Sequence, residues 1–336
     1  MLQRLARSCL PGQPRQRRRL LGAAAGMALV ILLGAVAALL PAEAAIRFKR
    51  SGESTLGGAD ALAGVREACE LDARHVWVAV EGQGECIAFY STPGLEGASQ
   101  AVIYFEGDIP PDYRRDAAKL AGHLAALRRT LELLAATYKL PYVLVARPGT
   151  FGSTGSHADR RKVREYLVIR EAVDAIRRRY GLSRITLAGQ SGGATITAAL
   201  LTLGLSHVRC AAPASGGYDL AAMLDWHASL QGLVGTHREH PASLSGSFDV
   251  MDRIAGVLRD PERRIFVLGD ARDRITPFAQ QQRFAGRIKA AGHHAEIVEA
   301  AGNGAERHGL SLASLKVAGL CASGATDAQI RRAVAK

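Results

Sequence analysis

Residues 185–196 read ITLAGQSGGATI, and this stretch decides the fold that we expect. Its start, ITLA, predicts a buried strand, and the Ala/Thr/Leu-rich residues that follow predict a helix. Between them, Gly189-Gln190-Ser191-Gly192-Gly193 fits the pattern G-x-S-x-G. At such a sharp turn the serine takes a strained backbone conformation, and small residues two before and two after it avoid clashes. The alternative interpretation is a Gly/Ser turn without chemistry.

A reactive serine needs a base, and the base needs an acid that orients it. At an elbow of this kind both follow the serine in the chain, the acid first. Residues 267–278, VLGDARDRITPF, follow a predicted strand and offer Asp273 in a D-x-I-x-P turn. Asp270 lies nearer the strand and is the alternative acid, or a brace for the loop. His308, in a Gly-rich loop after the last predicted strand, is the expected base.

The negative charge that develops during attack by Ser191 needs backbone donors. The N–H of Gly192, at the start of the predicted helix, is the first expected donor. The second should come from the loop after the apolar run 101–107, where the N–H of Asp108 is preferred over that of Ile109. The acidic side chains of Glu106 and Asp108 would suit a cationic group of a substrate. The neighbouring loop supplies four expected pocket neighbours: Arg147, Phe151, Ser153 and His157.

Strand-like and helical segments alternate along the chain and predict an α/β fold with a mainly parallel sheet covered on both faces. Residues 75–90 form an expected antiparallel hairpin with its turn at Glu81–Gly84. Further strands are predicted at 101–107, 142–149, 185–190, 207–215, 263–270 and 294–300. Helices are predicted at 117–138, 160–180 and 278–292. Another is predicted directly after Ser191, and two more in the C-terminal tail. Residues 217–262 interrupt the alternation just after a strand and predict a small helical cap.

Taken together, these motifs resemble those of the α/β-hydrolase superfamily. The resemblance rests on the elbow at Ser191, the turn at Asp273, His308, and the runs VIYFEGD and LVARPGTFGSTGS, and it covers about residues 76–335. It implies a serine hydrolase with the triad Ser191, Asp273 and His308, without a cofactor or a metal. Members usually carry His-Gly after the third strand, where this chain has Glu106-Gly107-Asp108. The SGG sequence of the elbow fits both esterases and exopeptidases.

The first 44 residues have the pattern of an export signal or an N-terminal membrane anchor. Residues 4–19 hold six arginines and no acid, residues 20–40 carry no charge, and Ala42-Glu43-Ala44 offers a cleavage site. The run 20–40 is long enough to span a bilayer, so a cleaved signal and a retained anchor both remain open. In either case the arginines predict a cytoplasmic N-terminus, with the rest of the chain exported. Residues 45–75 are expected to form a linker or extension, and residues 76–336 the catalytic domain.

The charge of the chain indicates which classes of partner it binds, and its cysteines indicate the compartment that suits it. The chain has a net charge of +12, most of the excess beyond residue 44 is spread over helical segments, and no nucleic-acid motif occurs, which excludes a nucleic-acid-binding protein. Cys69 and Cys86 flank the predicted hairpin and are the first expected disulfide, which leaves Cys210 with Cys321. Three pairings are open, as are buried free thiols. An even number of cysteines after residue 44 suits an oxidising compartment.

The sequence therefore predicts an exported hydrolase of carboxylic esters or small amides that acts through an acyl-enzyme on Ser191. A serine peptidase of the same fold is the alternative, since the acidic Glu106 and Asp108 would suit an N-terminal amine. A non-catalytic relative that binds a ligand is a third. The expected partners are a small ester or peptide and, through residues 20–40, a membrane. The sequence does not indicate the oligomeric state.

Overall fold

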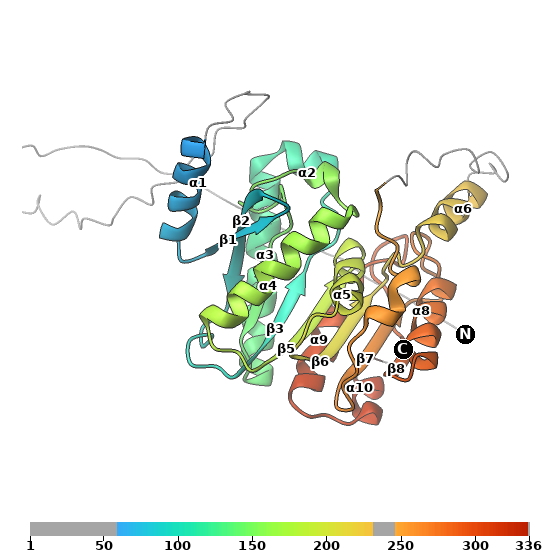
Figure 1. Ribbon diagram of the computed structural model, residues 1–336. Helices are drawn as coiled ribbons and strands as arrows, with labels where there is room; N and C mark the ends of the chain where they lie inside the picture. Colours follow the sequence, from blue (N-terminus) through green and yellow to red (C-terminus); the bar gives the residue numbers. More distant parts are fainter. Residues whose placement is uncertain (1–58, 231–245, 335–336) are drawn as a thin grey trace, which may run out of the picture. The chain divides into compact units, whose positions relative to one another are not determined.

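An eight-stranded sheet forms the centre of the fold in the computed structural model, which describes residues 59–230 and 246–334 (Figure 1). The strand order is β1-β2-β4-β3-β5-β6-β7-β8. The strands are β1 (His75–Val80), β2 (Gln83–Ser91), β3 (Gln100–Phe105), β4 (Tyr142–Val145), β5 (Arg184–Gln190), β6 (Val208–Ala214), β7 (Arg264–Gly269) and β8 (His294–Glu299). Each strand lies inside a run that the sequence pattern predicts to be a strand, or extends beyond the end of that run by a residue or two.

The sheet is parallel apart from one edge. β1 pairs antiparallel with β2, and β2 antiparallel with β4, while all the later pairs are parallel. The hairpin turn needs only Glu81 and Gly82, both with positive φ, 52° and 76°. A two-residue turn of this conformation matches the twist of the strands that it joins. The predicted hairpin and the mainly parallel sheet are confirmed.

Helices cover both faces of the sheet. One face packs against α4 (Val163–Arg179), α5 (Gly192–Thr202) and α8 (Phe278–Ala290), and the other against α3 (Ala117–Tyr138), α9 (Ser311–Ala322) and α10 (Asp327–Val334) (Figure 1). Successive side chains of β3 point to opposite faces of the sheet: Ile103 packs in the first helix layer and Tyr104 in the second. Because both faces are buried, the strands are continuously apolar, as is typical of parallel sheets.

The strand order reverses at β3, and this positions the site. The chain passes from β3 through α3 to β4, and then through α4 over β3 to β5. After β3 the chain turns to the α3 face, and after β5 it turns to the α5 face. The carboxyl ends of β3 and β5 therefore flank a crevice, the place where open α/β sheets bind ligands. Asp108 follows one of these strands and Ser191 the other.

The predicted cap insertion, residues 217–262, is described only in part. It contains α6 (Leu220–Leu230) and the 3-10 helix η3 (Met251–Gly256), and residues 231–245 lie outside the described part. The predicted signal or anchor, residues 1–44, also lies outside it. Along 59–230 and 246–334, we find no helix with the length and apolar character needed to cross a bilayer.

The extension before the sheet is more ordered than a linker. The expected linker 45–75 contains α1 (Ala59–Leu71), which packs on β1. The Cys69–Cys86 disulfide joins α1 to β2, and the Cys210–Cys321 disulfide joins β6 to the end of α9. Both predicted pairs are confirmed. They are of the kind that forms in an oxidising compartment.

The two disulfides are expected to contribute unequally to stability. Cys69 and Cys86 are 17 residues apart, and Cys210 and Cys321 are 111 apart. Because a longer loop restricts the unfolded chain more, replacing Cys210 and Cys321 by alanine should lower the free energy of unfolding by about 4–5 kcal/mol, against about 3 kcal/mol for the shorter loop. Urea unfolding of the two double variants measures this. Equal losses, or the reverse order, would contradict it.

Candidate active site

Ser191 occupies the sharp corner that the glycine pattern predicts. Its φ and ψ are 55° and −119°, a conformation that non-glycine residues rarely adopt, and it directly precedes α5. A Cβ on Gly189 would lie 2.2 Å from the backbone oxygen of Gly193, and one on Gly193 would lie 2.0 Å from that of Phe105. Both glycines are therefore required by close backbone approach. The corner holds the serine in a strained position at the crevice, as a nucleophile elbow does.

His308, after β8, pairs with Asp273, after β7. The Nδ1 of His308 lies 2.9 Å and 3.1 Å from the two carboxylate oxygens of Asp273. Asp273 is 4% exposed and also accepts from the N–H groups of Ile275 and Thr276 and from the Thr276 hydroxyl. Burial raises the pKa of the Asp273 carboxyl, but His308 and these N–H donors lower it more, so the net pKa lies below the ordinary value. An ionised Asp273 can orient the imidazole.

The Nε2 of His308 is the atom that would exchange a proton with Ser191. It is buried, and within the described residues it has no hydrogen-bond partner. Gln190, which directly precedes the serine, donates from Nε2 to the carbonyl of His308 at 3.0 Å, so the histidine loop is fixed to the elbow. Hydrogen bonds between a serine and its base often tighten only when substrate is bound.

Asp270 braces the loop that carries His308. Its fully buried carboxylate accepts from the N–H of Gly302 at 2.8 Å and from Arg307, the residue before His308, at 3.2 Å. It also accepts from the N–H of Arg272. The structure thus places the two candidate acids differently: Asp273 on the ring of His308, and Asp270 on the backbone that carries it.

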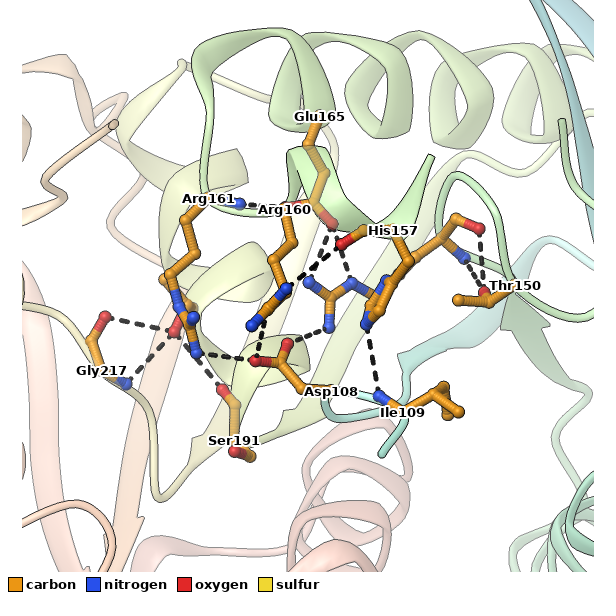
Figure 2. Close-up of polar contacts among 11 residues, drawn as sticks. Asp108, Ile109, Thr150, His157, Arg160, Arg161, Glu165, Ser191 and Gly217 are labelled. Atoms are coloured by element: carbon orange, nitrogen blue, oxygen red, sulfur yellow. Dashed lines mark hydrogen bonds and ion pairs between the residues drawn. The ribbon is translucent and has the colours of Figure 1, made fainter. Parts of the chain in front are cut away.

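The loop after β3 runs directly beside the elbow. A Cβ on Gly107 would lie 3.3 Å from the Cβ of Ser191, and one on Gly192 would lie 2.2 Å from the Asp108 carboxylate. The N–H groups of Gly192 and Asp108 donate to no other described residue. The N–H of Ile109, in contrast, donates to Nε2 of His157 at 3.3 Å (Figure 2). Of the two candidate donors in this loop, only Asp108 therefore has its N–H available.

His157 is a buried, uncharged histidine. Burial lowers its pKa to about 3, with a further contribution from Arg147. Because its Nε2 accepts a hydrogen bond from Ile109, the neutral ring carries its proton on Nδ1.

This histidine should make folding stability depend on pH. The pKa of His157 is lower in the folded chain than the roughly 6.5 of an unfolded one, so the unfolded state binds the proton first. Its contribution is complete above about pH 6.5 and is lost as the pH falls toward 3, by up to about 1.4 kcal/mol per pH unit. His157→Gln keeps an acceptor for Ile109 and should flatten that slope in urea unfolding between pH 7 and 4. The same slope in both proteins would contradict the assignment.

Three arginines surround the carboxylate of Asp108. Arg147 and Arg161 each donate to it at 2.7 Å and Arg160 at 3.2 Å (Figure 2). Arg147 is buried and also pairs with Glu165 at 2.8 Å. Burial raises the pKa of Asp108, but the three guanidinium groups hold it well below its usual range. The negative charge beside the expected oxyanion position is thus offset.

The other two predicted pocket neighbours lie farther out. Ser153 accepts from the N–H of Ala88 and so fastens its loop to β2. Phe151 is buried, and its carbonyl accepts from the Tyr90 hydroxyl. The structure therefore brings Arg147 and His157 to the site, and uses Ser153 and Phe151 to hold the loop that carries them.

A cavity of about 240 Å³ opens next to this arginine cluster. Its lining comprises Ala158, Arg160, Arg161, Leu220, Met223, Leu224 and Ser247. Met223 also lies against Gly217, whose carbonyl accepts from Thr195 in the first turn of α5. A larger cavity, about 600 Å³, lies at the amino end of β4, away from the carboxyl ends of the strands, and contains none of the candidate site residues.

Sequence reasoning missed four residues that hold the site together. Gln190 fixes the His308 loop, and Arg160 and Arg161 bind Asp108. Ser314 of α9 also bridges the strands below the elbow, since its hydroxyl donates to Ala212 and accepts from the N–H of Gly189. Only Gln190 carries a local signal, as the residue before the serine in G-x-S-x-G.

Comparison with known proteins gives structural neighbours only. No family model matches the chain, and neither does any curated protein. An esterase from Pyrococcus furiosus shares 13% identity over 69% of this chain and 83% of its own, with a TM-score of 0.49. Est1E from Butyrivibrio proteoclasticus shares 12% over 73% and 96%, with a TM-score of 0.48.

A Pyrococcus horikoshii acylaminoacyl peptidase shares 16% identity over 72% of this chain and 38% of its own, with a TM-score of 0.48. This chain thus spans well under half of that peptidase. The sheet order, the crossovers on both faces and the elbow after β5 all agree with the predicted architecture. The chain has the α/β-hydrolase fold.

Proposed function

We propose that the chain is an exported serine hydrolase that cleaves carboxylic esters or small amides through an acyl-enzyme on Ser191. The observation that carries the proposal is the pairing of His308 with the buried Asp273, on a loop that Gln190, the residue before the strained Ser191, ties to the elbow. This is the arrangement that general-base activation of a serine requires.

The reaction follows from these positions. His308 takes the proton of the Ser191 hydroxyl as the oxygen attacks the carbonyl carbon of the substrate, and Asp273 stabilises the imidazolium that forms. The N–H groups of Gly192 and Asp108 donate to the oxyanion. His308 then protonates the leaving alcohol or amine, and water, activated by the same histidine, releases the acid.

Asp108 bears on the choice between esterase and aminopeptidase. An aminopeptidase needs a free carboxylate for the ammonium group of its substrate, but the Asp108 carboxylate is bound by three arginines. Glu106 accepts from the Tyr104 hydroxyl at 3.0 Å. These contacts favour substrates without a free amine at this position, so we place esters first and peptides second.

A panel of substrates tests this choice. We expect 4-nitrophenyl acetate and butyrate to be hydrolysed with kcat/KM at least about 100-fold above that of aminoacyl 4-nitroanilides, because the Asp108 carboxylate that would hold the ammonium group is already bound by three arginines. The measurement is initial rates on purified residues 45–336. Faster cleavage of the aminoacyl anilides would favour the peptidase, and no turnover of either class would favour a non-catalytic binding protein.

Export is the second part of the proposal. The arginine-rich and uncharged segments of residues 1–44 and the two disulfides support it. Mass spectrometry of the chain from a membrane-enclosed host should find either an N-terminus at Ala45 or an intact chain in the membrane fraction. An intact chain in the cytoplasm, with its four paired cysteines reduced, would contradict export.

A further inference from the structure

We propose that the cavity lined by Arg160 and Arg161 binds a carboxylate of the substrate on these two side chains, so that the enzyme prefers acyl groups that end in a carboxylate. This inference rests on the proposed function and names the class of substrate. It is carried by three observations: a surplus of positive charge, a fixed guanidinium with a donor to spare, and the link from these arginines through Asp108 to the elbow.

The charges around Asp108 do not cancel. The cluster of Asp108 and its ionic partners contains three arginines and two carboxylates, since Glu165 pairs with Arg147. Burial disfavours a charged Arg147, but Glu165 and Asp108 raise its pKa, so it stays charged. One positive charge is left over, on the side where Arg160 and Arg161 line the cavity. A monoanion such as a carboxylate would balance it.

Arg161 is held in place but is not saturated with acceptors. Its φ is 66°, its N–H donates to Glu165 at 2.6 Å, and its carbonyl accepts from the N–H of Phe248 at 2.9 Å. Its Nη2 donates to Asp108, while its buried Nε has no acceptor in the described part of the chain. Its Nη1 donates to no described residue and is the donor left for a ligand. The strained backbone is typical of a residue positioned for binding.

Arg160 adds the exposed half of the site. Its side chain is 36% exposed, and its Nε and Nη1 are used by Asp108 and by the carbonyl of His157. Figure 2 shows the guanidinium groups of Arg160 and Arg161 both turned toward the carboxylate of Asp108. Two guanidinium groups that line one cavity suit charge-assisted hydrogen bonds to an anion.

The other wall of the cavity is apolar and the space is small. Leu220, Met223 and Leu224 of α6 face the arginines across the opening. Its volume of about 240 Å³ is below the roughly 300–1,000 Å³ of sites for drug-sized ligands. The cavity therefore fits a short aliphatic chain that ends in a charged group, and not a long acyl chain.

The position of the arginines indicates the acyl side of the substrate. His308, which must protonate the leaving group, follows β8, whereas Arg160 and Arg161 follow β4, on the opposite side of β5 in the sheet. Asp108 links these arginines to the elbow, since its carboxylate pairs with both of them and also occupies the space beside Gly192. An acyl chain that points away from His308 would reach this cavity.

The test compares two esters with acyl chains of similar length, 4-nitrophenyl hydrogen glutarate and 4-nitrophenyl hexanoate, after subtraction of spontaneous hydrolysis. Residues 45–336 should hydrolyse the glutarate with at least about 10-fold higher kcat/KM. Arg161→Gln should lower the glutarate-to-hexanoate ratio roughly 10- to 100-fold, the value of a lost charge-assisted hydrogen bond. Arg160→Gln should also lower it. Arg129→Gln, at an exposed position of α3, is the matched control and should not change it.

A binding measurement separates this proposal from the proposed function. Calorimetry with monomethyl glutarate on Ser191→Ala should show binding that Arg161→Gln weakens by a similar factor. Ser191-dependent hydrolysis of both esters at a ratio near one, in wild type and variants, overturns the carboxylate site and leaves the hydrolase intact. Binding without hydrolysis of either ester supports the site and overturns the hydrolase. A preference for 4-carboxyphenyl butyrate over the hydrogen glutarate overturns the assignment to the acyl side.

Discussion

Ser191→Ala is expected to lower kcat by about 10⁶-fold on any substrate that the enzyme turns over, because the variant has no nucleophile to form the acyl-enzyme. The residual rate should stay above that of water alone, since the backbone donors at Gly192 and Asp108 remain. The Ser191 side chain makes no cap hydrogen bond to α5, so its removal should change the melting temperature little. Stopped-flow and steady-state kinetics measure the change in kcat, and melting curves of the wild type and the variant measure the change in stability.

Ser215 provides a matched control for this substitution. It follows the neighbouring strand β6, has a similar positive φ of 51°, and is fully buried with no partner for its hydroxyl in the described residues. Ser215→Ala should leave kcat/KM close to the wild-type value, because the Ser215 hydroxyl has no hydrogen-bond partner, and so no paired base, within the described residues. Comparable losses in the two variants would show that Ser191 acts through the packing of the elbow and not as a nucleophile.

Asp273→Asn is expected to lower kcat by about 10⁴-fold. The asparagine keeps the size of the side chain, but it no longer stabilises the imidazolium, and it allows the wrong tautomer of His308. Its effect should appear in kcat more than in KM, because the lost interaction strengthens only in the transition state. Rates of the variant over a range of concentrations of the preferred ester give kcat and KM separately.

Asp270→Asn is the control for the choice between the two acids. Asp270 holds Gly302 and Arg307, so its replacement should cost about 1–3 kcal/mol of stability through the weakened loop. A displaced His308 should lower kcat by no more than about 100-fold. If Asp270→Asn proved the more damaging variant for kcat and Asp273→Asn the milder, the assignment of the acid would be reversed.

Local patterns account for the features that the sequence predicts correctly. The glycines at 189 and 193 identify the elbow because only they allow the backbone contacts that the structure shows. The strands are recognisable because their apolar runs end at Gly, Pro or Asp residues. Cys69 and Cys86 could be paired because they lie on either side of a hairpin turn that is itself visible in the sequence. Each of these signals lies within about twenty residues.

The features that sequence reasoning missed depend on contacts between distant positions. Arg161 and Asp108 are 53 residues apart, and Gln190 and His308 are 118 apart. Arginine runs such as Arg160-Arg161 read as a solvated surface until the fold brings them to Asp108. The helix α1 was missed for a different reason: the Gly-containing residues before it read as a linker, and its order depends on packing against β1.

The most direct test of the account is to treat residues 45–336 with a fluorophosphonate probe and to locate the modified residue by mass spectrometry. The structure predicts one adduct, on Ser191, that is absent from Ser191→Ala and forms much more slowly in Asp273→Asn. Labelling that persists in Ser191→Ala, or an adduct on another serine such as Ser215, would contradict the assignment of the nucleophile.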